Sequence, residues 1–389
     1  MKAQDQLFDA FPPTDKAAWL AKVEKDLKGK PLDDLNWQLS EEIELAPFYH
    51  PEDMKERYAP LLDGRQDNNW QIGEYVNVEA PKTANQQLLQ GLNGGVEAPL
   101  FRLYHPLEKN GLADLLKDVH PNMVALNFGE YYVDKRPEAL FGLLTEWLTE
   151  QGADPQQAGG SIDFDPLLDW SEPPMENLAG MMQQCAESWP GYRVLQINAR
   201  QYHGGPEEAV NELAMTIAKG SEYLHRLQQA GVSPTLANKH LQFGIAISKS
   251  YFVEIAKLRA LRLLWANVLN AYGAEHSRAQ LVVHFAPETQ DEQTNTNIIR
   301  ASTQAMSAVI GGADRLYVLP SDHIKQKGYS EFSLRIARNL QHLLKMESHL
   351  HRVIDPGAGS YYIEKLTDKL AEGAWARFQE LEREGAFAK

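Results

Sequence analysis

The sequence predicts an α/β chain built as a (β/α)8 barrel, with an N-terminal arm and a C-terminal strand-helix extension. Two observations carry this prediction: short β-like runs alternate with longer helical segments from Trp70 onward, and there are eight such runs. Alternating strands and helices form a parallel sheet, and eight units are the number that closes a barrel of about 250 residues. An open, doubly wound sheet is the alternative, but the even spacing of the units favours closure.

The chain divides into an arm, residues 1–65, and the barrel with its extension, residues 66–389. In the arm, Thr14 or Asp15 can cap a helix that carries apolar residues at helical spacing and ends at Gly29. These apolar residues are Trp19, Leu20, Val23 and Leu27. Such an arm wraps a neighbouring domain or subunit, or packs as a simple extension, and the sequence leaves both interpretations open.

The strands of the barrel are expected at Gln71–Val78, Pro99–Tyr104, Met123–Phe128, Gly160–Phe164, Arg193–Ala199, His240–Ile247, Gln280–Phe285 and Arg315–Leu319. The helices are expected near 83–92, 110–117, 136–150, 175–188, 206–230, 250–271, 292–310 and 329–346. Residues 347–389 should add the turn D-P-G-A-G-S, a short strand, Y-Y-I-E, and a final helix.

Composition excludes several classes of protein. A formal net charge of -15 disfavours nucleic acid or an anionic membrane as a partner. Cys185 is the single cysteine, so the chain can form neither an internal disulfide nor a cysteine-based metal site, which suits a reducing cytosol. No apolar run approaches the roughly 18–20 residues that a membrane span needs, and no signal core opens the chain. These observations predict a soluble cytoplasmic protein.

The segment from Ser250 to Val268 is predicted to be a helix buried on all sides, because apolar residues surround it. Ser250 can cap its N-terminus. Four charged residues nevertheless lie inside it, namely Glu254, Lys257, Arg259 and Arg262. Charges at covered positions persist only when they are paired and hydrogen-bonded. We therefore expect the helix to pack between two large surfaces, with its charges fixing the register.

Candidate functional residues follow the strands, because barrel chemistry sits at the C-terminal strand ends. They are Tyr104, His105, Asn127, Asp163, Asp165, Tyr202, His203, Ser248, Lys249, His284 and Leu319–His323. His203 is flanked by glycines and could contact a ligand, although a hydrogen-bonded loop histidine is the default. Asp163 and Asp165 would share one strand face and could serve acid–base chemistry, but a salt-bridged rim is the commoner outcome. Gly311–Gly312 fits either a phosphate site or a helix C-cap.

Nucleotide-binding and metalloprotease motifs are absent, and histidines and carboxylates never cluster at metal-ligand spacing, so no metal is expected. Asp118 and His120 begin like a cobalt-ligand motif, D-x-H-x-x-G, but the glycine is missing and the segment lies inside the barrel repeat. Composition and spacing therefore predict a barrel without a mechanism.

The segment F-V-E-I-A-K-L-R-A-L-R-L-L-W-A, at 252–266, closely resembles the signature helix of the methylmalonyl-CoA mutase family. Three further segments resemble the family in order and spacing: N-I-I-R-A-S-T-Q-A-M-S-A-V-I-G-G-A-D (297–314), R-I-A-R-N-L-Q-H-L-L-K-M-E-S (335–348) and V-I-D-P-G-A-G-S-Y-Y-I-E-K-L-T (353–367). The arm is similar to that of the family's small subunit. The resemblance implies a (β/α)8 barrel, and a structural signature of Glu254, Lys257, Arg259, Arg262 and Asp355.

In catalytic members of that family, acyl-CoA threads the barrel axis and a Tyr-His motif follows strand five. Tyr202 and His203 are the nearest counterparts and the weak catalytic candidates, although a two-residue shift would place Gln201 there. The positions whose Asn and Glu approach the adenosyl group are occupied here by Leu319 and His323. The strand runs M-V-A-L-N-F, V-L-Q-I-N-A and L-V-V-H-F also offer bulky apolar side chains, which would fill the axis.

The leading hypothesis is a non-catalytic small subunit of a heterodimeric, adenosylcobalamin-dependent methylmalonyl-CoA mutase. The resemblance implies that the catalytic large subunit supplies adenosylcobalamin and interconverts methylmalonyl-CoA and succinyl-CoA, while this chain binds no cofactor; alone, it could form a homodimer. The family's cobalamin-binding domain is not evident, so the chain is either a naturally short subunit or a shortened one. Two alternatives stay open: a catalytic substrate subunit working with a separate cobalamin-binding protein, and a stand-alone assembly factor.

Overall fold

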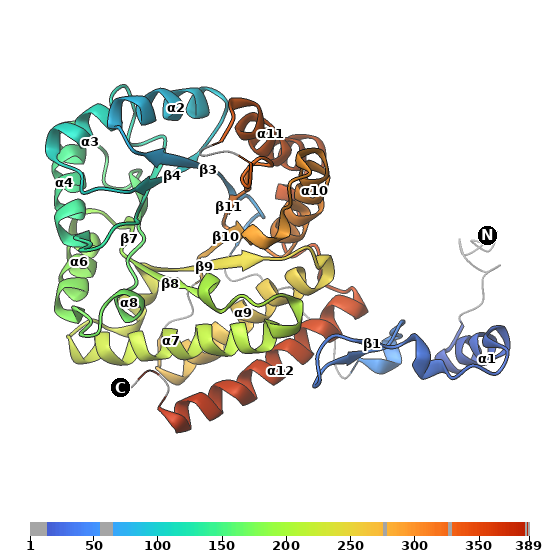
Figure 1. Cartoon of the computed structure of the whole chain (residues 1–389). Coiled ribbons are helices and arrows are strands. Elements are labelled where there is room, and N and C mark those ends of the chain that lie inside the picture. Colours follow the sequence, from blue (N-terminus) through green and yellow to red (C-terminus); the bar gives the residue numbers. More distant parts are fainter. Residues whose placement is uncertain (1–13, 55–64, 275–277, 326–328, 386, 388–389) are drawn as a thin grey trace, which may run out of the picture.

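The computed structural model describes residues 14–54, 65–274, 278–325, 329–385 and 387. Parts of the predicted arm lie outside these ranges. Viewed down the barrel axis in Figure 1, a ring of strands is surrounded by a ring of helices, and the arm projects to one side.

Within the described residues, the barrel sheet contains nine parallel strands in the order β7-β6-β5-β4-β3-β11-β10-β9-β8. They span Gln71–Val78 (β3), Ala98–Leu103 (β4), Ala125–Glu130 (β5), Gly159–Ile162 (β6), Gly191–Arg193 (β7), Leu195–Asn198 (β8), Leu241–Ile247 (β9), Leu281–Phe285 (β10) and Arg315–Tyr317 (β11). β7 and β8 are two pieces of the fifth predicted strand, interrupted at Val194, whose N–H donates to His240 O at 3.0 Å. Gln196 N–H donates to Phe164 O at 2.9 Å and so joins the end strand β8 to the segment that follows β6, beside the other end of the sheet. The predicted barrel closure is confirmed.

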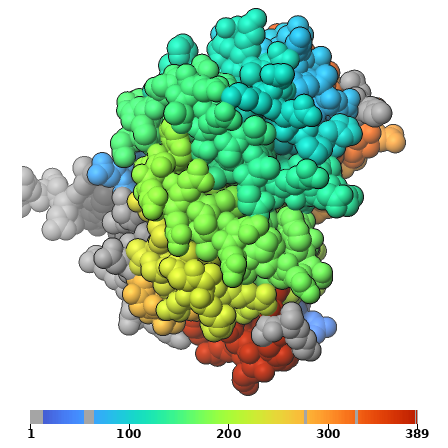
Figure 2. Space-filling model, turned by 90° about the vertical axis from the view of Figure 1, so that its left-hand side faces the viewer, coloured from blue at the N-terminus to red at the C-terminus, as the bar shows by residue number. Residues whose placement is uncertain are grey.

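The helices of the barrel follow their strands as the sequence predicts. They are α2 (Pro81–Asn93), α3 (Lys109–Leu115), α4 (Pro137–Glu150), α5 (Pro166–Asp169), α6 (Met175–Ser188), α7 (Ala209–Gln229), α8 (Pro234–Lys239), α9 (Tyr251–Ala271), α10 (Thr294–Ile310) and α11 (Glu331–His342), the last continued by a π-helical turn at Leu343–Glu347. Figure 2 shows that the flank formed by consecutive segments, coloured from cyan to yellow-green, is a continuous surface.

The C-terminal extension contains no strand among its described residues. The segment Tyr361–Glu364 forms the first turn of α12 (Tyr361–Glu384), so the predicted short strand is wrong. α12 packs along α7 and α9 on the outside of the barrel (Figure 1). α9 therefore lies between the barrel and α12, as its all-round apolar surface predicts.

The described part of the arm contains the helix α1 (Lys16–Leu27) and an antiparallel hairpin of β1 (Trp37–Gln38) and β2 (Glu44–Leu45). Asp15 caps α1 by accepting a hydrogen bond from Ala18 N–H at 2.7 Å. The hairpin is anchored, because Leu45 is fully buried. No residue of α1 is buried, so this helix extends away from the barrel (Figure 1).

Candidate functional site

The charged residues of α9 are buried and paired, as the sequence predicts. Lys257 Nζ lies 2.8 Å from Glu254 Oε2 and 2.9 Å from Glu212 Oε2 in α7, and it donates to Ala246 O at 2.8 Å. Burial disfavours the cation, but the two carboxylates raise the pKa of Lys257 above its usual value. Glu254 also accepts from Ser248 N–H at 2.9 Å, whereas the predicted side-chain cap by Ser250 does not form.

The two arginines of α9 tie the helix to distant parts of the chain. Arg259 binds Asp355 through two hydrogen bonds, of 2.8 and 3.0 Å, and also binds Glu364 in α12. Arg262 binds Asp314, which precedes β11, at 3.0 Å, and donates to Gly312 O at 2.5 Å. Gly311 caps the end of α10 and Gly312 has φ of +89°, so the helix C-cap interpretation of this glycine pair is confirmed.

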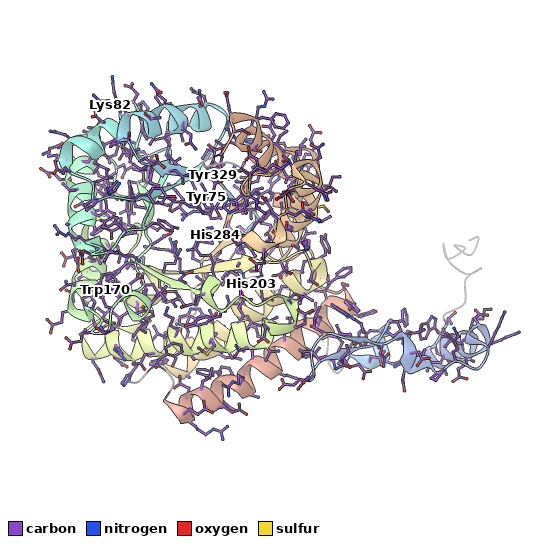
Figure 3. All side chains as sticks on the ribbon, viewed as in Figure 1. Tyr75, Lys82, Trp170, His203, His284 and Tyr329 are labelled. Atoms are coloured by element: carbon purple, nitrogen blue, oxygen red, sulfur yellow. The ribbon has the colours of Figure 1, made fainter. Side chains whose placement is uncertain are left out.

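His203 belongs to the same network as α9. Its Nδ1 lies 3.0 Å from Glu212 Oε2, and its Nε2 lies 3.5 Å from Glu288 Oε1. The side chain is 3% exposed. Figure 3 shows His203 near α7, away from the middle of the ring of strands. Tyr202 ends the short 3₁₀ helix Ala199–Tyr202, and burial raises its pKa.

Asp163 and Asp165 do not act as a pair on one strand face, because β6 ends at Ile162. Asp163 accepts from Ser161 at 2.8 Å and from Gln242 at 3.0 Å, and burial raises its pKa. Asp165 instead lies 2.6 Å from Lys219 Nζ in α7. The two carboxylates line the same hollow of about 320 Å³ at the C-terminal mouth. The salt-bridge interpretation holds for Asp165.

The axis of the barrel is occupied by an aromatic cluster, which we define as Tyr75, His284, Tyr317 and Tyr329. The hydroxyl of Tyr75 lies 2.8 Å from His284 Nδ1, and the rings of Tyr75 and Tyr317 stack at 5.2 Å. Arg102 lies over the Tyr75 ring, 3.8 Å from its centre, and donates to the Tyr329 hydroxyl at 3.0 Å. Figure 3 shows Tyr75, His284 and Tyr329 together inside the ring of strands.

The electrostatics of this cluster favour neutral rings beside fixed arginine cations. Burial lowers the pKa of His284 well below its usual range, and nearby Arg200, Arg102 and Arg315 lower it further. Burial raises the pKa of Tyr75 as well. The cluster therefore offers a neutral imidazole and a protonated phenol already bonded to one another.

The sequence predicts that bulky apolar side chains fill the barrel interior. The interior is filled, but the prediction is wrong about the kind of side chain that fills it. Strand residues alternate between faces, and Phe101 and Phe128, paired at 4.7 Å, lie on the face that meets the helices. Phe243 likewise packs on Trp265 of α9. The large inward-facing residues are mostly polar or aromatic, with Leu100 and Val282 as aliphatic members of the same face; the polar and aromatic ones include Tyr75, Arg102, Asn127, Gln196, Gln242, His284, Arg315 and Tyr317.

Sequence reasoning missed Tyr75, Arg102 and Tyr329. The available signal was Arg102 inside an otherwise apolar strand, F-R-L, because an unbroken buried strand rarely carries a charge. His284 was identified only as a strand-end residue. Which face of each strand points inward depends on the barrel register, which one strand alone does not reveal.

At the two positions where the family resemblance implies adenosyl contacts, Leu319 is 3% exposed and its carbonyl accepts from Gln290 at 3.0 Å. The ring of His323 lies 6.0 Å from that of Tyr329, and burial lowers its pKa. Among the described residues, no group of three His, Cys, Asp or Glu side chains is placed to hold a metal ion. None of the described helices is long and apolar enough to cross a membrane.

The fold and the site define a (β/α)8-barrel protein whose axis is closed by side chains and whose signature helix carries a buried charge network. Residues 130–389 match the Methylmalonyl-CoA mutase family. The chain belongs to the methylmalonyl-CoA mutase family.

Relatives of this chain include proteins named methylmalonyl-CoA mutase small subunit. The protein from Porphyromonas gingivalis is 34% identical over 100% of this chain and 66% of its own length. The one from Propionibacterium freudenreichii subsp. shermanii is 30% identical over 97% of this chain and 64% of its own length. The chain thus spans about two thirds of these relatives. Among solved structures, a dihydropteroate synthase from Xanthomonas albilineans covers 72% of this chain and 94% of its own, at 13% identity and a TM-score of 0.41.

Proposed function

We propose that this chain is the small subunit, or the barrel part of it, of a heterodimeric adenosylcobalamin-dependent methylmalonyl-CoA mutase, and that it is a structural partner and not the catalyst. The observation that carries the proposal is the aromatic cluster on the barrel axis. An acyl-CoA threaded along that axis would need the space that Tyr75, His284 and Tyr317 occupy. Close-packed side chains cannot yield such a path without rearrangement.

The proposal assigns adenosylcobalamin to the large subunit. At the family's adenosyl-contact positions this chain carries the apolar, buried Leu319 and the half-buried His323. Neither supplies the amide or the carboxylate that the family resemblance implies, so these residues do not fit the group. No step of the isomerisation is therefore assigned to this chain.

The arm supports a partner subunit. Along α1, Trp19, Leu20, Val23 and Leu27 stay only half-buried, and Trp19 stacks on Phe48 at 4.5 Å. An apolar stripe of this kind gains stability when a partner covers it. We propose the large subunit as that partner, with self-association as the alternative for the chain alone. A cytoplasmic location is proposed from the single cysteine.

Co-purification tests the proposal. The chain, tagged, is co-expressed with the large subunit from the same organism, and the mass of the purified complex is measured by analytical ultracentrifugation. We expect a one-to-one complex. Recovery of the tagged chain alone would contradict the partnership and would favour the stand-alone assembly factor.

A further inference from the structure

A polar cavity of about 490 Å³ lies at the end of the barrel opposite the candidate site. Its walls come from the N-terminal ends of the strands, including Gln71, Glu97, Gly159, Arg193 and Arg315. Active sites of (β/α)8 barrels form at the other end, so this cavity is separate from the candidate site described above.

Neither of two arginines in the cavity wall, Arg193 and Arg315, forms an ion pair with a carboxylate of the described chain, although the charge of Arg315 lowers the pKa of the buried Asp163. Arg315 is 3% exposed; its Nε donates to Gln71 at 3.0 Å, but its buried Nη1 has no hydrogen-bond partner within the described ranges. The Nε of Arg193 is also buried without a partner, and no carboxylate of the described chain lies within ion-pair distance of Arg193. Burial lowers the pKa of Arg193 to about 10, and the charge of Arg315 lowers it further. The guanidinium of Arg193 therefore remains charged at neutral pH.

The carboxylates beside them are already neutralised. Asp314 binds the guanidiniums of Arg65, Arg262 and Arg278. Glu97 binds Lys345 at 3.1 Å and accepts from Ile72 N–H at 2.8 Å. Positive charge therefore dominates this cavity, although the whole chain carries a net charge of -15. Buried cations without partners cost stability, so their retention calls for an anion.

Side chains separate the cavity from the upper part of the barrel. Above Gln71, Gly73 has no room for even a Cβ atom, because the ring of Tyr317 would lie 2.6 Å from it. The aromatic cluster lies beyond. An anion in the cavity must therefore be compact, or extend outward to solvent.

We propose that this cavity is a binding site for a phosphate group, held by the guanidiniums of Arg193 and Arg315. Guanidinium groups match phosphate oxygens in charge and geometry, and such bonds are roughly twice as strong as neutral hydrogen bonds. The phosphate comes either from free inorganic phosphate or from a phosphate ester that reaches in from solvent. This inference does not depend on the proposed function.

Isothermal titration calorimetry on the full chain tests the site, with inorganic phosphate and ADP as separate ligands at matched ionic strength. We expect saturable binding of at least one ligand, weakened about tenfold or more in Arg193→Met and in Arg315→Met. Binding of inorganic phosphate without binding of ADP would indicate that the site holds the free ion. Binding of ADP that inorganic phosphate competes away would indicate that the site holds a phosphate ester. Arg352→Met removes the same charge from an exposed position and should leave binding unchanged.

Thermal unfolding in chloride buffer separates a binding residue from a structural one. Arg193 has no partner to lose, so Arg193→Met should leave Tm unchanged or raise it, while abolishing stabilisation by the ligand. Absence of binding to the wild-type chain would overturn the proposal. So would equal binding by wild type and both cavity variants, or a drop in Tm for Arg193→Met.

Discussion

Arg259 joins the barrel to the C-terminal extension through one guanidinium. It binds Asp355, Glu364 and Thr367, and all four side chains are buried. Removing one member of a buried ionic group leaves the others charged in a medium that solvates them poorly. The pairing, more than the helix itself, therefore fixes how α9 meets α12.

Replacing Arg259 with Met should lower the free energy of unfolding by about 3–5 kcal/mol, because Asp355 and Glu364 lose their shared cation. Urea denaturation followed by circular dichroism measures the loss. The matched control is Arg377→Met, which removes an exposed ion pair with Glu380 and should cost no more than about 1 kcal/mol. Equal losses in the two variants would contradict the account of the buried network.

His203 is held by Glu212, so we expect His203→Ala to destabilise the chain by about 1–3 kcal/mol. Turnover by the complex with the large subunit should stay unchanged when measured below the melting temperature of the variant. A loss of orders of magnitude in kcat, with stability preserved, would instead support the catalytic alternative.

His284 makes stability depend on pH. Because burial depresses its pKa in the folded state, the unfolded chain binds the proton more readily. Its contribution is therefore complete above the unfolded value of about 6.5 and is lost as pH falls below it. When the pH falls from 7.5 to 5.5, the free energy of unfolding of the His284→Gln variant should decrease by about 1 kcal/mol less than that of the wild type. Urea denaturation at the two pH values measures this difference. His240, whose pKa burial also lowers, titrates in both proteins and cancels in this comparison. An identical pH dependence would rule out this role for His284.

At the scale of elements, periodicity predicted the barrel strands and helices well, because each presents a local pattern. The segment Y-Y-I-E was mispredicted as a strand, since tyrosine and isoleucine favour strands locally. Its place in α12 is stabilised by tertiary contact, with Glu364 bound to Arg259. The predicted side-chain cap by Ser250 is likewise absent, and Glu254 instead accepts the N–H of Ser248.

The arm helix should matter for assembly and little for folding. In α1, the triple variant Trp19→Ser, Val23→Ser, Leu27→Ser should weaken the complex with the large subunit at least tenfold, measured by surface plasmon resonance. The chain alone should keep the wild-type Tm within a few degrees, because no residue of α1 is buried. The control Lys22→Ser and Lys25→Ser changes exposed positions of the same helix. Unchanged affinity in the triple variant would exclude α1 from the interface.

At the scale of the whole molecule, the closed barrel was predictable from the count of strand-helix units, whereas the contents of its axis were not. The sequence indicated a filled interior, and the filling consists mainly of Tyr75, Arg102, His284 and Tyr317, with few aliphatic side chains. Strand alternation assigns residues to two faces but does not state which face turns inward. Which strand face turns inward is decided by how the sheet closes into a barrel and by which face packs against the surrounding helices.

The proposed division of labour between this chain and a large subunit is tested most directly by turnover of methylmalonyl-CoA with added adenosylcobalamin. This chain, the large subunit and their mixture are assayed side by side. The account predicts no turnover by this chain at any concentration and full activity in the mixture, because the aromatic cluster closes the barrel axis. Isomerisation by this chain with cobalamin, or with a separate cobalamin-binding protein, would contradict it.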